Sequence, residues 1–130
     1  MRRGQAAGLR RHPCYLCHVK LADQPPRVQD ALKELALRLG ARFDDALVLL
    51  RLFGSRARGH ANAGSDVDVA VVLEHAGWRE RCAVIDVAAD VGLEYDLDVS
   101  PTVLDRSTYE RWRDQERPLV LDIEREGIPL

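Results

Sequence analysis

Two short motifs carry the side chains of this chain that are best suited to chemistry. Gly54-Ser55 follows an apolar run, and after ten intervening residues the run Asp-Val-Asp occupies 66–68. Because glycine lacks a Cβ, a turn at Gly54 lets backbone N–H groups approach phosphate oxygens, and Ser55 adds a hydroxyl where a short helix is expected to begin. Arg56 and Arg58 add positive charge nearby. The first motif is therefore typical of a turn that receives a polyphosphate.

The second motif supplies paired acids. Asp66 and Asp68 are two positions apart in an expected strand, so their side chains share one face. Placing two like charges side by side in an otherwise apolar strand is costly unless a cation neutralises them. Mg²⁺ prefers carboxylate and phosphate oxygens as ligands. The two motifs together predict a nucleotide site that holds magnesium.

A third acid is expected farther along the chain. Residues 93–99 read Leu-Glu-Tyr-Asp-Leu-Asp-Val, and this alternation predicts a short strand. Asp96 and Asp98 would lie on the same face of that strand. Either carboxylate is a candidate to complete the acidic cluster.

At these positions the chain resembles the minimal nucleotidyltransferase (MNT) family, small members of the DNA polymerase β-like nucleotidyltransferase superfamily. The resemblance covers residues 27–130, and the family signature, Gly-Ser followed after ten residues by Asp-x-Asp, is matched one for one. It implies an α/β (α+β) domain in which helices pack on a small mixed β-sheet. The positions that it assigns to nucleotide binding are Gly54, Ser55, Arg58 and Ser65.

The same resemblance implies a reaction. ATP would be the donor, two Mg²⁺ ions would assist, and AMP would be transferred with release of pyrophosphate. Asp66 and Asp68 would be catalytic metal ligands. In the family the third acid lies between hydrophobic residues on a strand, which favours Asp96 over Asp98 for the same role.

The resemblance also suggests a partner. MNT proteins often serve as antitoxins that adenylylate a tyrosine of a HEPN-type ribonuclease toxin, so a toxin protein is the expected acceptor. Two alternatives remain open at this point. The chain could be a non-catalytic nucleotide-binding module that neutralises its partner by contact, or the catalytic subunit of a small-molecule or RNA nucleotidyltransferase.

Hydrophobic spacing and turn residues outline the elements that must position the site. They predict a helix over 27–39, strands near 46–53 and 67–73, a helix over 78–91 that stops at Gly92, and a last helix from Pro118 to Gly127.

Two further details concern the helices in the second half of the chain. In the helix over 78–91, the residues expected to face inward are Cys82, Ile85, Ala88 and Ala89. Ser107-x-x-Glu110 has the spacing of a capping box and predicts the start of another helix.

Charge divides the chain into two parts. Residues 1–20 carry five basic and no acidic side chains, whereas the whole chain has a net charge of −2. We expect residues 1–26 to be a disordered basic extension, or to precede the functional start of the protein, and residues 27–130 to form the domain. Because that domain is acidic, no direct nucleic-acid binding by it is expected.

Composition and cysteines suggest the compartment. Hydrophobic residues make up 46% of the chain, and no apolar stretch is long enough for a membrane span. The three cysteines are an odd number, and no export signal is evident, so reduced thiols and a cytoplasmic location are expected. Cys14 and Cys17 have CxxC spacing, but a second ligand pair for structural zinc is not apparent, and a haem attachment would require export.

Overall fold

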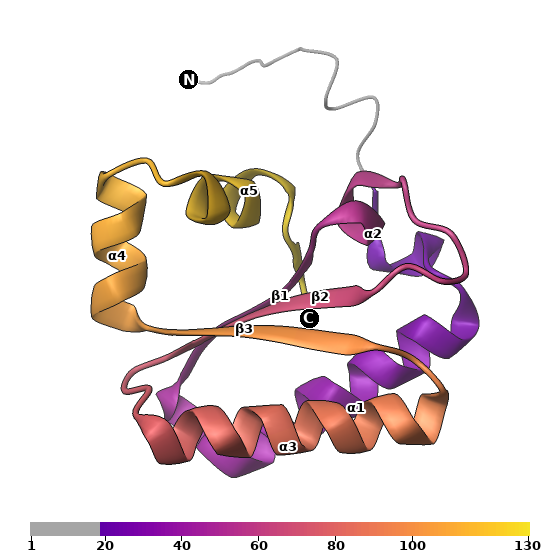
Figure 1. Cartoon of the computed structure of the whole chain (residues 1–130), viewed down its shortest axis with the longest axis horizontal. Helices are drawn as coiled ribbons and strands as arrows, with labels where there is room; N and C mark the ends of the chain where they lie inside the picture. The colour runs from indigo at the N-terminus through magenta and orange to yellow at the C-terminus, as the bar shows by residue number, and fades with distance from the viewer. Residues whose placement is uncertain (1–18) are drawn as a thin grey trace.

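A four-stranded mixed sheet organises the part of the chain that this computed structural model describes, residues 19–130 (Figure 1). The strand order is β3-β2-β1-β4. β1 pairs antiparallel with β2 and β4, and β2 pairs parallel with β3. The strands are β1 (Leu47–Phe53), β2 (Val67–Leu73), β3 (Val99–Asp105) and β4 (Ile128–Pro129).

Helices cover both faces of the sheet. α1 and α3 pack together below the sheet in the view of Figure 1, and α4 and α5 lie above it. A short helix, α2, joins β1 to the loop that leads into β2. The helices are α1 (Pro26–Phe43), α2 (Ser55–Arg58), α3 (Trp78–Tyr95), α4 (Arg106–Asp114) and α5 (Pro118–Glu126), with 3₁₀ turns at Leu21–Asp23 and Asp44–Ala46.

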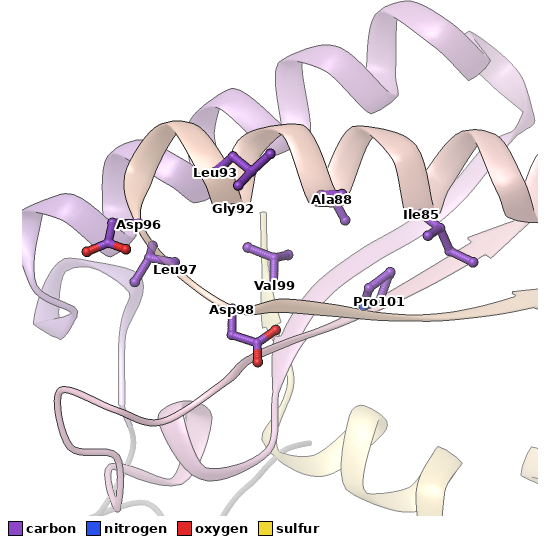
Figure 2. Close-up of a pocket in the computed structure, with 10 residues that line it drawn as sticks. Ile85, Ala88, Gly92, Leu93, Asp96, Leu97, Asp98, Val99 and Pro101 are labelled. Atoms are coloured by element: carbon purple, nitrogen blue, oxygen red, sulfur yellow. The ribbon is translucent and has the colours of Figure 1, made fainter.

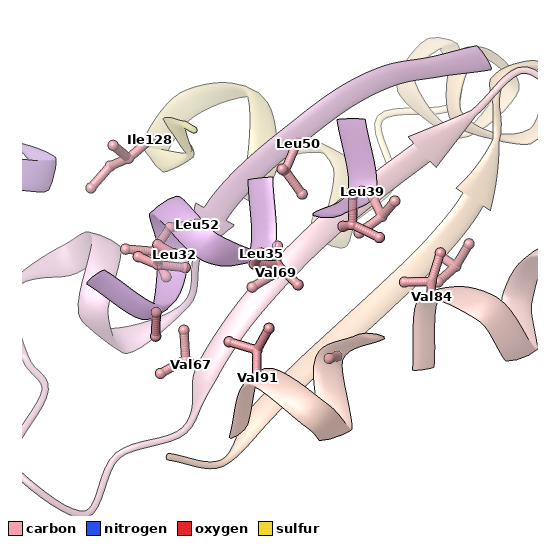
Figure 3. Packing of buried hydrophobic residues seen from close by; sticks show 14 of the residues in the cluster. Leu32, Leu35, Leu39, Leu50, Leu52, Val67, Val69, Val84, Val91 and Ile128 are labelled. Carbon is pink, nitrogen blue, oxygen red and sulfur yellow. The ribbon is translucent and has the colours of Figure 1, made fainter. Parts of the chain in front are cut away.

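The central strand β2 explains why the sheet forms where it does. Six of its seven residues are buried, as expected for a strand covered on both faces. Val67, Val69 and Val71 face α1 and α3, where they join the larger core shown in Figure 3. Ala70 and Val72 face the opposite way and join the core under α4 and α5. Asp68 has the alternation of this second set, so the strand directs it toward the α5 side.

The predicted fold class is confirmed, and most elements agree with their predicted positions. α1 contains the predicted helix 27–39, β2 coincides with the predicted strand 67–73, and β1 begins one residue after the start of the predicted strand 46–53. α1 does not stop at Gly40 but continues through it to Phe43, four residues past 39. The last helix, α5, starts at Pro118 and ends before Gly127, as predicted.

The predicted strand over 93–99 is wrong. α3 passes through Gly92 and ends at Tyr95, and β3 begins only at Val99. Gly92 is required for a close approach: a Cβ there would lie 2.6 Å from the Leu97 carbonyl oxygen. Leu97 folds back under the helix end and donates its N–H to the Gly92 carbonyl at 2.9 Å. The glycine therefore permits packing against the next turn and does not stop the helix.

Part of the predicted extension belongs to the packed domain. Val19 and Leu21 contact the larger core, and Gln24 is buried, with its side-chain amide donating to the Arg56 carbonyl at 3.0 Å. Residues 1–18 of the predicted extension, including Cys14 and Cys17, lie outside the described residues. Within residues 19–130, no helix combines the length and apolar character that a membrane span requires.

The predicted capping box at Ser107 and Glu110 is also wrong. α4 begins at Arg106, and the residue before it, Asp105, caps the helix: its carboxylate accepts the Thr108 N–H at 2.9 Å. The Ser107 hydroxyl only adds a hydrogen bond to the same carboxylate, at 3.1 Å. Asp105 is the last residue of β3, so one side chain ends the strand and starts the helix.

Replacing Asp105 with alanine tests this cap. We expect Asp105→Ala to lower the free energy of unfolding by about 1 kcal/mol, the usual loss for a helix N-cap, whereas Ser107→Ala changes it by less than about 0.5 kcal/mol. Urea denaturation at pH 7 measures both. The Thr108 hydrogen bonds lower the pKa of the Asp105 carboxyl, so its stabilisation is present at neutral pH and lost in acid. The difference between wild type and Asp105→Ala should therefore shrink below about pH 4, and a larger loss in Ser107→Ala than in Asp105→Ala would contradict the assignment.

Candidate active site

The Asp68 carboxylate lies against the turn that follows β1. In the β1–β2 ladder Asp68 is paired with Phe53, the residue directly before Gly54. Gly54 has a φ of 77°, and a Cβ added to it would collide with the Asp68 carboxylate. Only glycine permits both this backbone conformation and this contact. The two motifs of the sequence are thus brought together by strand pairing.

The turn itself leads directly into α2. Gly54 is the residue before the helix, and its carbonyl accepts the Arg58 N–H at 3.1 Å. The Ser55 carbonyl accepts the His60 N–H at 2.9 Å, which closes the short helix. The first amides of any helix have no partner within it, so they are available to an anion at the turn. Gly54 and Ser55 are half-buried, as a ligand-facing turn requires.

Two further acids lie at the same end of the sheet. Asp66 is exposed and directly precedes β2, and Asp98 directly precedes β3. The Val67 N–H donates to the Asp98 carbonyl at 2.8 Å, and Asp68 is in register with Ser100. Because β2 and β3 are parallel, their starts meet at one edge of the sheet.

The electrostatics agree with this placement. Partial burial raises the pKa of the Asp68 carboxyl above its ordinary value, and the charges of Asp66 and Asp98 raise it further. Arg58 acts in the opposite direction. The Asp66 and Asp98 carboxylates therefore both repel the partly buried Asp68 carboxylate, and a divalent cation would relieve this repulsion.

Asp96 does not belong to this cluster. It follows α3 with a φ of 54°, its side chain is 99% exposed, and its nearest charged partner is Arg27, at 3.7 Å. The expectation that Asp96 joins Asp66 and Asp68 is therefore corrected: the structure brings Asp98 to the pair. Asp98 was recognised in the sequence as the alternative, but the helical ending at Tyr95 could not be seen there.

Arg58 and Ser65, the other predicted nucleotide-binding residues, have different surroundings. The Arg58 guanidinium lies 3.4 Å from a Glu126 carboxylate oxygen at the end of α5 and still acts on Asp68. It can therefore attract an anion at the turn. The Ser65 hydroxyl accepts the Asn62 N–H at 2.9 Å and shapes the loop before β2. In this structure Ser65 has a local structural role.

The role of Arg56 was missed in the sequence, where it counted only as local positive charge. Its side chain is only 4% exposed, and it donates to the carbonyl oxygens of Ser65, at 2.9 Å, and Asn62, at 3.4 Å. Arg56 thus ties the helix of the first motif to the loop that delivers Asp66. Its burial depends on this loop geometry, for which residues 56–65 contain no periodic signal.

The donor set can be tested against magnesium. Among residues 19–130, no three His, Cys, Asp or Glu side chains form a ready-made metal site. Mg²⁺ does not require one, because it usually binds one or two carboxylates together with substrate phosphates. Asp66 and Asp68 beside the Gly54 turn fit that chemistry. Magnesium would accordingly be held together with the nucleotide.

The contact between Gly54 and Asp68 can be tested by adding one methyl group. We expect Gly54→Ala to lower the free energy of unfolding by about 2–3 kcal/mol, since the new Cβ meets a carboxylate and strains a left-handed backbone. Gly40→Ala is the matched control: it lies inside α1 with no atom within 4 Å of the new Cβ, so it should stabilise by about 0.5–1 kcal/mol. Chemical denaturation of both variants measures the contrast, and equal stabilities would refute the close contact.

The repulsion around Asp68 predicts a pH-dependent stability. Because the folded-state pKa of Asp68 is raised, its contribution to stability is present in acid and is lost as the pH rises through that pKa. In EDTA at pH 7, Asp68→Asn should therefore raise the melting temperature by about 2–5 °C, the effect of ~1 kcal/mol in a domain of this size. Asp96→Asn should leave it within about 1 °C, since that side chain is outside the cluster. A melting temperature of Asp68→Asn equal to or below that of wild type would show that no such repulsion exists.

Comparisons with known proteins identify the family of this chain. Residues 32–123 match a family model described as a nucleotidyltransferase domain. A "Putative protein adenylyltransferase" of Methanocaldococcus jannaschii is 33% identical over 75 residues, which are 57% of this chain and 76% of that protein.

Solved structures share the fold. A "putative minimal nucleotidyltransferase" aligns with a TM-score of 0.54 and 27% identity, covering 87% of this chain and 98% of the other. A toxin–antitoxin crystal structure with AMP-PNP aligns with a TM-score of 0.50 and 23% identity, covering 73% and 68%, a likeness of fold alone. The family model spans most of the domain and contains both motifs, so the resemblance to the minimal nucleotidyltransferases is confirmed: the chain belongs to the nucleotidyltransferase domain family and is a nucleotidyltransferase.

Proposed function

We propose that this enzyme transfers AMP from ATP to a protein acceptor in a Mg²⁺-dependent reaction. One observation carries the proposal: the Gly54 turn lies against Asp68 at the edge of the sheet where Asp66 and Asp98 also lie. A triphosphate in that turn would have its charged groups beside three carboxylates. That combination is productive only when Mg²⁺ neutralises both sides.

Each residue of the site has a distinct part in this proposal. The Gly54-Ser55 turn receives the phosphates through its amides, and Arg58 adds a positive charge. Asp66 and Asp68 would hold two magnesium ions. When bound, Mg²⁺ lowers the pKa of the acceptor hydroxyl and neutralises charge on the leaving group.

Asp98 is the third acid of this proposal, in place of Asp96. Its exposed carboxylate is free to orient the acceptor hydroxyl and to accept its proton. The acceptor oxygen forms a bond to the α-phosphorus as the bond from that phosphorus to the bridging oxygen breaks. Pyrophosphate leaves with the electron pair of the broken bond.

The acceptor is proposed to be a protein. The relative from Methanocaldococcus jannaschii, 33% identical to this chain, carries the name of a protein adenylyltransferase. The fold neighbour solved with AMP-PNP is a toxin–antitoxin assembly. We therefore propose a toxin protein as the partner, a tyrosine of a HEPN-type toxin as the acceptor, and a cytoplasmic site of action.

Labelled ATP tests the catalytic assignment. Purified enzyme, Mg²⁺ and α-labelled ATP are incubated with a HEPN-type toxin protein as candidate acceptor, and label on the toxin is measured after denaturing electrophoresis. We expect Asp66→Asn, Asp68→Asn and Asp98→Asn each to reduce the labelling rate by at least about 100-fold, because each removes a charge at the reacting centre. Asp96→Asn is the matched control: with toxin at saturating concentration it should keep more than about half of the wild-type rate, because its carboxylate lies outside the acidic cluster.

Other outcomes separate the remaining possibilities. Neutralisation of the toxin by all four variants without any label would show a module that acts by contact. Label on RNA or on a small molecule, and none on protein, would assign a different acceptor. Equal labelling by Asp98→Asn and Asp96→Asn would contradict the role of Asp98.

A further inference from the structure

α3 carries an apolar face that the fold does not use. Trp78, Ile85 and Leu93 are 80%, 53% and 83% exposed, and they are three of the four large hydrophobic side chains that are exposed among residues 19–130. Their spacing, seven and eight residues, places them along one side of the helix. Ile85 was expected to face inward, but it is exposed, and Val84, Ala88 and Val91 form the buried side of α3. Side chains of this kind gathered on one surface mark an interaction site.

Part of this face forms one wall of a groove. The groove, about 670 Å³, runs between α3 and β3, and Figure 2 shows its apolar lining. Ile85, Ala89 and Leu93 come from the helix, and Val99 and Pro101 come from the strand. β3 is an edge strand of the sheet, so nothing within residues 19–130 pairs with its outer side.

The groove ends at the acidic cluster. Asp98, which precedes β3 and acts on the pKa of Asp68, is one of its lining residues, and Asp96, which lies 3.7 Å from Arg27, is another. A protein segment lying in the groove would therefore bring its neighbouring residues to the reacting centre. A second groove, between Gln24 and the loop at 59–63, contains none of the three clustered acids.

Charge along the groove indicates the kind of partner. Asp86 and Asp90 are exposed on α3, each one position after a groove-lining residue, and Asp98 lies at the end. None of these three is in an ion pair with another residue of 19–130. A second copy of the chain docked through the same face would bring its own acids against them. A segment with apolar side chains flanked by Lys or Arg is complementary.

We propose that this groove is the docking site of the acceptor protein, which inserts an apolar segment flanked by basic residues and thereby places its hydroxyl group beside Asp98. The inference rests on the proposed transfer of AMP to protein and adds the surface that selects the acceptor. It separates docking from chemistry: Ile85 and Leu93 bind the acceptor, while the Gly54 turn and the acids bind the nucleotide.

Steady-state kinetics with the toxin as acceptor test this separation. The double variant Ile85→Ser/Leu93→Ser should raise the KM for the toxin at least about tenfold, because central apolar contacts dominate protein interfaces. Its kcat should stay within about twofold, and so should the KM for ATP. Leu37→Ser is the matched control, because Leu37 is 68% exposed on α1 outside the groove, and it should leave all three parameters unchanged. An unchanged toxin KM in the double variant would overturn the proposal.

Photocrosslinking tests docking without requiring transfer. A benzoylphenylalanine at position 85 should crosslink to the toxin in the presence of Mg²⁺ and a non-hydrolysable ATP analogue, and the same group at position 37 should not. Crosslinking of position 85 to a second copy of this chain, or equal crosslinking from both positions, would refute the proposed occupant. If wild type transfers no AMP but position 85 crosslinks to the toxin, the proposed reaction fails and the docking site stands.

Discussion

The site depends on the close approach of Gly54 to the Asp68 carboxylate. This contact is possible only because the β1–β2 register pairs Phe53 with Asp68 and because residue 54 has no side chain. A shift of one residue would turn Asp68 toward α1 and place a valine at the turn. The parallel pairing of β2 with β3 then brings Asp98 to the same edge, while Arg56 holds the loop that leads to Asp66. The strand register therefore determines where the acids lie.

Such a cluster opposes folding, and the surrounding core must compensate for it. The charges of Asp66 and Asp98 act on a partly buried Asp68, which is unfavourable until a cation and a nucleotide arrive. β2 remains folded despite this repulsion because its remaining residues are buried on both faces, in two separate cores. A strand that is covered on both sides is the element least able to move. The carboxylates of the site are therefore held in fixed positions although their charges repel. Such a preorganised arrangement suits the binding of magnesium and substrate.

The sequence predicts the parts of this fold whose signals are local. The spacing of apolar residues identifies α1, and the short runs of Val and Leu identify β1 and β2, because burial on one or both faces determines those patterns. Residues 93–99 show the limit. Alternating polar and apolar residues there arise from a helix end, a left-handed residue at Asp96 and a turn, and not from a strand. The close contact of Gly92 with Leu97 decides between a strand and a helix end. The local sequence pattern does not reveal this contact, because it forms only in the folded chain. The burial of Arg56 is hidden for the same reason, since it requires the loop at 62–65 to fold over the guanidinium.

The end of α3 connects the catalytic and the binding surfaces. Had the helix stopped at Gly92, a strand over 93–99 would have buried Leu93 and placed Asp96 at the edge of the sheet. Instead α3 continues for one more turn, which leaves Leu93 exposed beside β3. β3 begins only at Val99, so the residue before it, Asp98, lies beside Asp66 and Asp68. A helix that packs through Val84, Ala88 and Val91 needs no second apolar side to fold. Binding therefore explains the exposed apolar side of α3 better than stability does. The end of α3 at Tyr95 both leaves Leu93 in the groove and places Asp98 at the end of the groove.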